Sequence, residues 1–277
     1  MMRKNGALTA YKTWRTELLF KNILLRLKQH QFLFEELVKR DFKQKYKRTV
    51  LGMGWSILSP LLQLLVMKIV FTTFFGRNTP FYTTYLFAGN LLFNFFREST
   101  NGGMSSLMSN HHIFTKINVP KYIFLLSKNV SSIINFGLNL VIFFIFAAID
   151  GVPFTWKFIT LIYPIIYLIL FNIGIGLILS ALYIFFRDIQ YLYDILTMLL
   201  MYMSAIFYTV DSYPANIQNV FYVNPIFCAI KYFRSVVIDG VIPAWWLHLI
   251  MIGFAALALL IGGIMYKKKN HDFLYYV

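Results

Sequence analysis

The sequence of 277 residues has very little charge and a single cysteine. Charged residues make up only 13% of the chain, while 58% of its residues are hydrophobic and 19% are aromatic. A soluble domain carries roughly 25% charged residues, so ionic side chains could not keep such a surface hydrated. The apolar fraction also excludes intrinsic disorder. Because Cys228 has no second cysteine, an internal disulfide and a thiolate metal cluster are excluded, and we interpret it as a small packing residue.

Acidic residues are scarcer than basic ones. Eleven Asp and Glu residues stand against 26 Lys and Arg residues, which gives a formal net charge of +15. A nucleic-acid-binding domain would also be basic, but it would not have a mean hydropathy of +0.63. The composition therefore indicates an integral membrane protein, and we expect no nucleic-acid partner.

Nucleotide-binding and hydrolytic motifs are absent from the sequence. It contains no G-x-x-x-x-G-K-[ST] phosphate loop, no G-x-G-x-x-G fingerprint, no H-E-x-x-H and no G-x-S-x-G. The polar segments between its apolar runs are too short to hold a nucleotide-binding domain. We therefore expect no cofactor, metal or catalytic residue on this chain, and any ATP that drives it must be bound by another chain.

Long apolar runs predict an all-α polytopic membrane protein, since a span needs about 20 mainly apolar residues in a helix. Two small-residue patterns, Gly176-x-x-x-Ser180 and Ala258-x-x-x-Gly262, would permit close helix packing, although such patterns are frequent by chance. The six predicted spans are residues 54–75, 81–107, 124–149, 158–186, 193–210 and 246–266.

The distribution of cations orients these spans. An even number of spans places both ends of the chain on one side, and that side holds 20 of the 26 Lys and Arg residues, 13 of them within residues 1–51. Cation-rich loops stay in the cytoplasm, so both termini are expected to be cytoplasmic. The predicted units are a cytoplasmic extension (1–29), an interfacial helix (30–52), a six-span domain (53–266) and a cytoplasmic tail (267–277).

The predicted interfacial helix combines an apolar stripe with a cluster of cations. Apolar residues recur at every fourth position from Phe34 to Val50, and six Lys and Arg residues lie within residues 39–48. Such a helix lies with its apolar side among acyl chains and its cations at the phosphates. It is either a topological anchor alone or also the entrance for an anionic, lipid-linked substrate. The predicted entrance residues are Lys43, Lys47, Arg48 and Trp55.

Residues 211–244 form an apolar segment on the outer side that is too long for a turn. Its apolar runs are broken by Pro214, Pro225, Gly240 and Pro243. Backbone that enters a membrane must be buried in protein or line a cavity. We therefore predict two short re-entrant helices here, with an amphipathic surface flap as the alternative.

Ionisable residues inside predicted spans are costly and need partners. Arg97 and Glu98 are adjacent and point about 100° apart on a helix, so they cannot pair with each other. With Asn101, they are predicted to face either a pathway or an interface. Lys68 also lies in a span, but a lysine can snorkel to the membrane surface.

Two short cytoplasmic segments follow the second and fourth spans. The first contains His111 and His112, which make a poor metal site without a third ligand, so a short helix that ends before Pro120 is the better interpretation. The second begins with Arg187 and Asp188, and Asp188 is a candidate N-cap for the next helix.

Several short motifs occur in a fixed order from about residue 30 to the end of the chain. They are Arg40-Asp41-Phe42-Lys43-Gln44-Lys45-Tyr46-Lys47, Thr49-Val50-Leu51-Gly52-Met53-Gly54-Trp55, Leu58-Ser59-Pro60, Phe114-Thr115-Lys116-Ile117-Asn118-Val119-Pro120, Phe185-Phe186-Arg187-Asp188 and Tyr222-Val223-Asn224-Pro225. Each is weak alone. Their order on the expected topology resembles the permease subunits of ABC-2 type polysaccharide exporters, which move O-antigens, teichoic acids and capsular glycans.

The resemblance implies a homodimer that works with two copies of a separate ATPase, which would bind ATP and Mg. The cargo would be a glycan on undecaprenyl diphosphate that crosses the bacterial cytoplasmic (inner) membrane, with membrane lipids around the chain. Outer half-helices would close the exit through Tyr222, Asn224 and Pro225. The implied ATPase-coupling residues are His111, His112, Ile113, Phe114, Thr115, Lys116, Pro120, Arg187 and Asp188.

Three alternative functions stay open at this point. An ABC-2 permease for drugs or small lipids would share the same topology. A membrane enzyme that acts on lipid-linked sugars would need a general base or an acid cluster, and the cytoplasmic acid pair Asp188 and Asp194 stands alone. A non-catalytic assembly subunit is the third. We expect a transport subunit rather than an enzyme.

Overall fold

The computed structural model describes residues 25, 28–75, 80–210, 213–269, 272–274 and 276. Within these residues every regular element is a helix, which confirms the predicted all-α class. The predicted N-terminal extension, residues 1–29, lies outside the described residues except at positions 25, 28 and 29.

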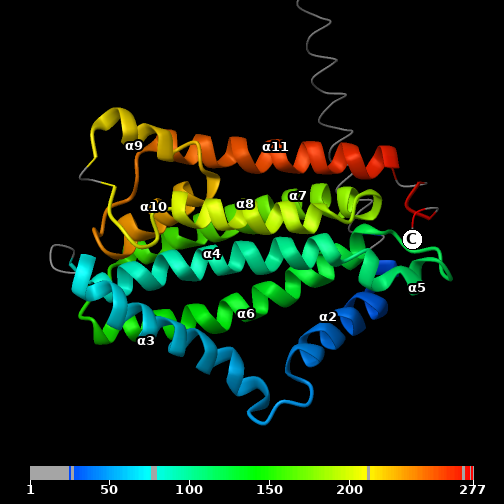
Figure 1. Ribbon diagram of the computed structural model, residues 1–277, viewed down its shortest axis with the longest axis horizontal. Helices are drawn as coiled ribbons and strands as arrows, with labels where there is room; N and C mark the ends of the chain where they lie inside the picture. Colours follow the sequence, from blue (N-terminus) through cyan, green and yellow to red (C-terminus); the bar gives the residue numbers. More distant parts are fainter. Residues whose placement is uncertain are drawn as a thin grey trace, which may run out of the picture.

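A helix lies at each of the six predicted spans. Figure 1 shows α4, α6, α7 and α11 side by side along the long axis, with α9 and α10 at one end and α5 at the other. The helices are α2 (Gln31–Tyr46), α3 (Trp55–Phe75), α4 (Tyr82–Ser105), α5 (His111–Phe114), α6 (Tyr122–Ile149), α7 (Ile162–Phe185), α8 (Ile189–Met203), α9 (Ala215–Phe221), α10 (Pro225–Val237) and α11 (Trp245–Lys269). Short 3₁₀ turns are η1 (Gly52–Gly54), η3 (Met108–Asn110), η4 (Trp156–Leu161) and η5 (Asp272–Leu274).

Three of the described helical segments are long and apolar enough to cross a membrane by themselves. They are Tyr122–Ile149, Trp156–Phe185 and Trp245–Lys269. The α9–α10 pair, bent by 108°, would give a fourth span or a re-entrant loop, as predicted for the outer segment. The number of six spans stays a prediction, because α3 and α8 have shorter apolar stretches and α4 is polar.

The polar helix α4 is enclosed by the rest of the bundle. Of its 24 residues, 17 are buried, and it packs against α6 and α7 along its length. A helix surrounded by protein need not present an apolar surface to lipid, so hydroxyl and amide groups are tolerated where they find partners. Ser99 donates to Asn129 Oδ1 of α6 (2.5 Å), and Tyr193 of α8 donates to Thr100 Oγ1 (2.5 Å).

Small residues bring α4, α7 and α11 close together. A Cβ atom placed on Gly174 of α7 would lie 2.6 Å from the carbonyl carbon of Ala258 in α11. One placed on Gly103 of α4 would lie 3.0 Å from Cα of Gly176 in α7. A Cβ on Gly262 would lie 2.8 Å from the Gly174 carbonyl oxygen. Both small-residue patterns in the sequence therefore mark real helix contacts.

Two sequence predictions need correction. The fifth span, predicted to reach residue 210, ends at Met203, because Ala205 has a left-handed φ of 50° and its carbonyl accepts a bond from Arg234. The apolar stripe of α2, predicted to face acyl chains, packs partly on protein. Phe34 packs against a buried cluster that contains Leu37, Leu107 and Phe114, whereas Val50 lies beyond the helix end and is fully exposed.

Asn172 of α7 provides a test of this packing. Its side chain is fully buried, and neither its amide nitrogen nor its oxygen has a hydrogen-bond partner among the described residues. An unpaired buried polar group costs about 1–3 kcal/mol. We expect Asn172→Leu to hold or raise the midpoint of thermal unfolding in detergent, by roughly 2–4 °C per kcal/mol relieved.

The matched comparison is Asn129→Leu, which removes the partner of Ser99 and should lower the midpoint. Equal destabilisation by both substitutions would contradict the assignment of Asn172 as an unpaired group.

Candidate functional site

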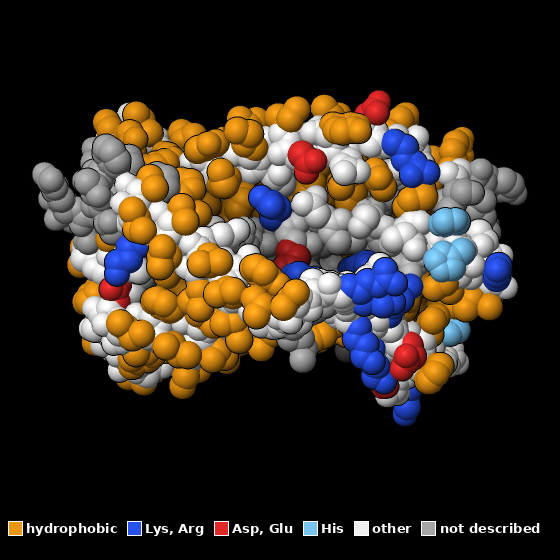
Figure 2. Space-filling view, turned by 60° about the horizontal axis from the view of Figure 1, so that its bottom comes forward, with side chains coloured by type: hydrophobic (Ala, Val, Ile, Leu, Met, Phe, Trp, Pro, Cys, Tyr) orange, Lys and Arg blue, Asp and Glu red, His pale blue; other side chains and the backbone are white. Residues whose placement is uncertain are grey.

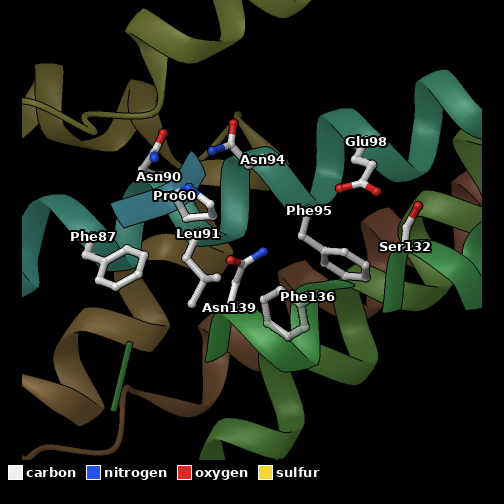
Figure 3. Close-up of a pocket in the computed structure, with 10 residues that line it drawn as sticks. All are labelled: Pro60, Phe87, Asn90, Leu91, Asn94, Phe95, Glu98, Ser132, Phe136 and Asn139. Atoms are coloured by element: carbon white, nitrogen blue, oxygen red, sulfur yellow. The ribbon is translucent and has the colours of Figure 1, made fainter. Parts of the chain in front are cut away.

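A groove opens between α3, α4 and α6 (Figure 3). Its cavity volume is about 30 Å³, which is room for one or two water molecules, so the groove is narrow in this conformation. Its lining residues on α4 are three or four positions apart and therefore share one face of that helix. The groove is lined by Pro60 of α3, by Phe87, Asn90, Leu91, Asn94, Phe95 and Glu98 of α4, and by Ser132, Phe136 and Asn139 of α6.

The amide groups of this groove have unused hydrogen-bonding capacity. Asn90 and Asn94 make no side-chain hydrogen bond to any described residue. Asn139 donates to the Asn135 carbonyl (3.0 Å), but its own Oδ1 is buried and has no partner in the described part of the chain. Buried polar groups in proteins are almost always bonded. The Asn139 Oδ1 atom is therefore the buried acceptor in this groove that a water or a ligand could reach with a hydrogen bond.

Glu98 closes one end of the groove through two bonds to the same oxygen. Lys45 of α2 donates to Oε1 at 2.8 Å, and Asn135 of α6 donates to it at 2.7 Å. The Lys45 and Glu98 side chains are 45% and 39% exposed. Ion pairs with this much exposure contribute about 0–1 kcal/mol, so a bound ligand could displace Lys45 at little cost.

Of the three predicted pathway residues, only Glu98 lines the groove. Arg97 is exposed and does not pair with Glu98, as the helix geometry predicted. The Asn101 Oδ1 atom is buried without a partner in the described residues, outside the lining. Sequence reasoning missed Asn90 and Asn94, although the spacing of four residues between 90, 94 and 98 marks one helix face.

The predicted entrance cations lie on or just after α2 and are all exposed, namely Lys43, Lys47 and Arg48. Trp55, at the start of α3, is 40% exposed. Figure 2 shows basic side chains gathered toward the end of the molecule where α2 and α5 lie, on a face that is otherwise mostly hydrophobic. The cation that reaches a groove residue is Lys45, which the sequence prediction did not select.

A buried carboxylate anchors α2 to the bundle. The Asp41 side chain is 3% exposed and accepts from Lys128 of α6 (3.1 Å) and from Arg40 (2.8 Å). Arg40 also donates to Asn110 Oδ1 (2.8 Å), directly before α5. Helix α2 therefore contacts the α5 end of the bundle through Arg40 and the groove through Lys45.

The predicted coupling segment has one buried side and one exposed side. Phe114 is buried, while His111, His112, Thr115 and Lys116 are exposed. The two partly buried members of this segment are Ile113 and Pro120. Within the described residues, no group of three or more His, Cys, Asp and Glu side chains could hold a metal ion.

An aromatic cluster seats this segment on the end of the bundle. The Phe114 ring lies 5.9 Å from the Phe124 ring, and Lys121 Nζ lies over the rings of Phe114 and Phe273, at 5.8 and 5.3 Å. Burial lowers the pKa of Lys121. Phe273 also contacts Phe185 at the end of α7 (5.9 Å), so the two predicted coupling regions share one packed layer.

The second predicted coupling contact is exposed. Arg187 lies 5.7 Å from the centre of the Tyr183 ring. Asp188 occupies the N-cap position of α8, as predicted, but its side chain makes no capping hydrogen bond. Both side chains are free to meet another surface.

The predicted outer-gate residues form the corner between α9 and α10. Asn224 caps α10, accepting from the Ile226 amide (2.9 Å), and it donates to Ser204 Oγ (3.0 Å). Pro225 follows at the first helical position, where its missing N–H costs nothing. The Tyr222 ring lies 4.9 Å from the Trp246 ring. The start of α10 therefore accounts for the presence of Asn224 and Pro225 at this corner.

Sequence reasoning missed a buried cation at this end. Arg234 of α10 is 5% exposed and donates to the carbonyls of Tyr85 (3.0 and 3.2 Å), Ala205 (2.8 Å) and Ile206 (2.9 Å). Its guanidinium also lies 3.4 Å from the Tyr85 ring centre. We call this arrangement the Arg234 clamp. It joins α10, α4 and the segment after α8.

Comparison with known proteins identifies related chains. Residues 33–238 match the family model described as ABC-2 type transporter, which covers the fold from α2 to α10. The chain is 28% identical over 192 residues to the O-antigen export system permease protein RfbA of Myxococcus xanthus, covering 69% of this chain and 73% of the relative. An O-antigen export system permease protein RfbA of Klebsiella pneumoniae is 27% identical over 248 residues, which cover 87% of this chain and 95% of the relative. The polysialic acid transport protein KpsM of Escherichia coli is 22% identical over 243 residues, which cover 87% of this chain and 94% of the relative.

The Arg234 clamp can be tested at Gly89, beside it on α4. A Cβ atom on Gly89 would lie 2.5 Å from Nη2 of Arg234, so the guanidinium would have to leave its carbonyl partners. We expect Gly89→Ala to destabilise the protein by about 1–3 kcal/mol, measured as thermal unfolding in detergent.

The matched control is Gly253→Ala in α11, where a Cβ atom meets nothing within 4 Å. Alanine is the better helix former by about 1 kcal/mol, so this change should be neutral or stabilising. Equal effects at the two positions would argue against the clamp.

Proposed function

The chain belongs to the ABC-2 type transporter family, and we propose that it is the transmembrane permease subunit of an ATP-driven polysaccharide exporter. The cargo is a glycan, such as an O-antigen or a teichoic acid, carried on undecaprenyl diphosphate. The subunit lies in the bacterial cytoplasmic (inner) membrane with both termini in the cytoplasm. The relatives named for O-antigen export support this assignment.

The groove along α4 is the observation that carries the proposal. A hydrophilic polymer that crosses a membrane needs hydrogen-bond partners, because the hydrocarbon region supplies none. The groove offers the amides of Asn90, Asn94 and Asn139, and the Asn139 Oδ1 atom is buried without a partner in the described residues. The phenylalanine rings of the lining are almost fully buried, so the amides and Glu98 are the groups that a polymer would meet. This combination favours a glycan over an apolar drug or a small lipid.

A separate ATPase subunit supplies the energy for transport by hydrolysing ATP. Two copies of a separate ATPase bind ATP and Mg and dock on the coupling segments of a permease homodimer. The exposed face of α5 suits such docking, because its buried side is fixed by Phe114. Motion of this segment reaches α2 through the Arg40–Asn110 bond and reaches the groove through the Lys45–Glu98 pair.

The exposed cations on and just after α2 attract the diphosphate group of the substrate. A diphosphate carries negative charge at the membrane surface, where each nearby Lys or Arg contributes about 1 kcal/mol of attraction. The exposed side chains of Lys43, Lys47 and Arg48 make no hydrogen bond or ion pair with the described residues that would have to be broken first. The lipid tail stays in the bilayer while the sugar chain enters the groove.

The entrance can be tested by charge removal. We expect Lys43→Gln, Lys47→Gln and Arg48→Gln together to lower surface glycan at least about fivefold, because roughly 3 kcal/mol of attraction is lost. Co-purification with the ATPase should be unchanged. The matched control, Lys43→Arg with Lys47→Arg and Arg48→Lys, keeps every charge and should export normally. Unchanged surface glycan in the glutamine variant would refute the entrance.

The coupling role can be tested on the exposed face of α5 and the residues after it. We expect Thr115→Glu with Lys116→Glu to release the ATPase or to leave its hydrolysis uncoupled from export, because docking needs a complementary surface. Lys267→Glu, an exposed cation on α11, is the control and should have neither effect. Normal co-purification together with normal export in the double variant would count against docking at this segment.

A further inference from the structure

We propose that the groove between α3, α4 and α6 binds uncharged sugar units and disfavours sugars that carry a carboxylate or a phosphate. This inference rests on the proposed function, because it names the kind of polymer that the exporter carries. It follows from the chemistry of the ten residues that line the groove.

Amides match the hydroxyl groups of neutral sugars. An asparagine side chain donates through its nitrogen and accepts through its oxygen, and a sugar hydroxyl does both as well. Asn90, Asn94 and Glu98 are four residues apart, so the row extends about 12 Å along α4. Ser132 and Asn139 of α6 face the same space (Figure 3). A row of this length can contact consecutive sugar units once the groove has widened beyond the cavity volume of about 30 Å³ that it has here.

The aromatic part of the groove is uncharged as well. Phe87, Phe95 and Phe136 belong to the lining, and the rings of Phe95 and Phe136 are 4.5 Å apart. These rings are almost fully buried, so they form an apolar wall behind the amides and add no charge to the groove.

Charge selects against acidic sugars. None of the ten lining residues is a lysine or an arginine, and one, Glu98, is a carboxylate. Lys45 lies at the same end and pairs with Glu98 Oε1, so moving it to an anionic sugar would leave the charge of Glu98 without a partner cation. An anionic sugar would meet repulsion from Glu98 without a compensating cation along the row. A hydroxyl, in contrast, can donate to Glu98 Oε2, since both protein donors use Oε1.

Binding can be measured on the full chain in lipid nanodiscs by saturation-transfer NMR. The probes are maltoheptaose, which is neutral, and hepta-galacturonate, which carries a carboxylate on every unit. We expect transfer to maltoheptaose to be at least about fivefold stronger than transfer to hepta-galacturonate. The double variant Asn94→Leu with Asn139→Leu should reduce the maltoheptaose signal about fivefold. Glu98→Gln should lower the ratio of the maltoheptaose signal to the hepta-galacturonate signal. Asn172→Leu, outside the groove, should change neither signal.

Equal transfer to the two probes, or an unchanged signal in the Asn94/Asn139 variant, would overturn the inference. Far-ultraviolet circular dichroism and the unfolding midpoint of each variant show whether a lost signal comes from lost folding. Should the double variant fail to fold, Asn94→Asp replaces it, because an added carboxylate should weaken maltoheptaose transfer little and abolish the residual transfer to the acidic probe.

Surface glycan in cells separates this inference from the proposed function. Cells that make a neutral lipid-linked glycan and carry the wild-type chain with its ATPase should display the glycan, and the Asn94/Asn139 variant should display at least about fivefold less. Normal display by the variant overturns the role of the groove and leaves the exporter in place. If cells with the wild-type chain display no glycan, the proposed function as an exporter is refuted. The NMR measurement then tests the sugar preference of the groove by itself.

Discussion

The enclosure of α4 is the constraint on which the rest of the structure depends. This helix carries the Asn90, Asn94 and Glu98 row and could not face lipid along its length. Close approach to α7 at Gly103 and Gly176, and of α7 to α11 at Gly174 and Ala258, surrounds it with backbone and apolar side chains. Between α3 and α6 this helix is covered less completely, and the groove lies there.

Hydropathy predicted the positions of the long helices in this fold. Each predicted span corresponds to a helix, whereas the capping of α10 by Asn224 was not predicted and the predicted cap Asp188 makes no capping bond. The spans are local features, because an apolar run depends on neighbours in sequence. The early end of α8 and the enclosure of α4 could not be predicted, because Arg234 and the helices that surround α4 are distant in sequence.

The candidate site likewise combines features that are evident in the sequence with features that depend on how the helices pack. Glu98 was identified because a charge in an apolar run is conspicuous, but its partners Lys45 and Asn135 depend on the path of α2 and on the rotation of α6. Asparagines are less conspicuous in a hydropathy profile, so Asn90 and Asn94 became evident only when α4 and α6 faced the same space. The single observation that the sequence offered was their spacing of four residues.

Arg234 and Lys45 bind α4 near its two ends, and the contacts of Lys45 are easier to break than those of Arg234. At the α10 end, the buried Arg234 guanidinium donates to three backbone carbonyl groups, and breaking these bonds would leave buried polar groups unpaired. At the α2 end, Lys45 and Glu98 form an exposed pair that water can replace. The groove therefore opens more readily at the α2 end. In the proposed topology this is the cytoplasmic end, where an exported polymer has to enter.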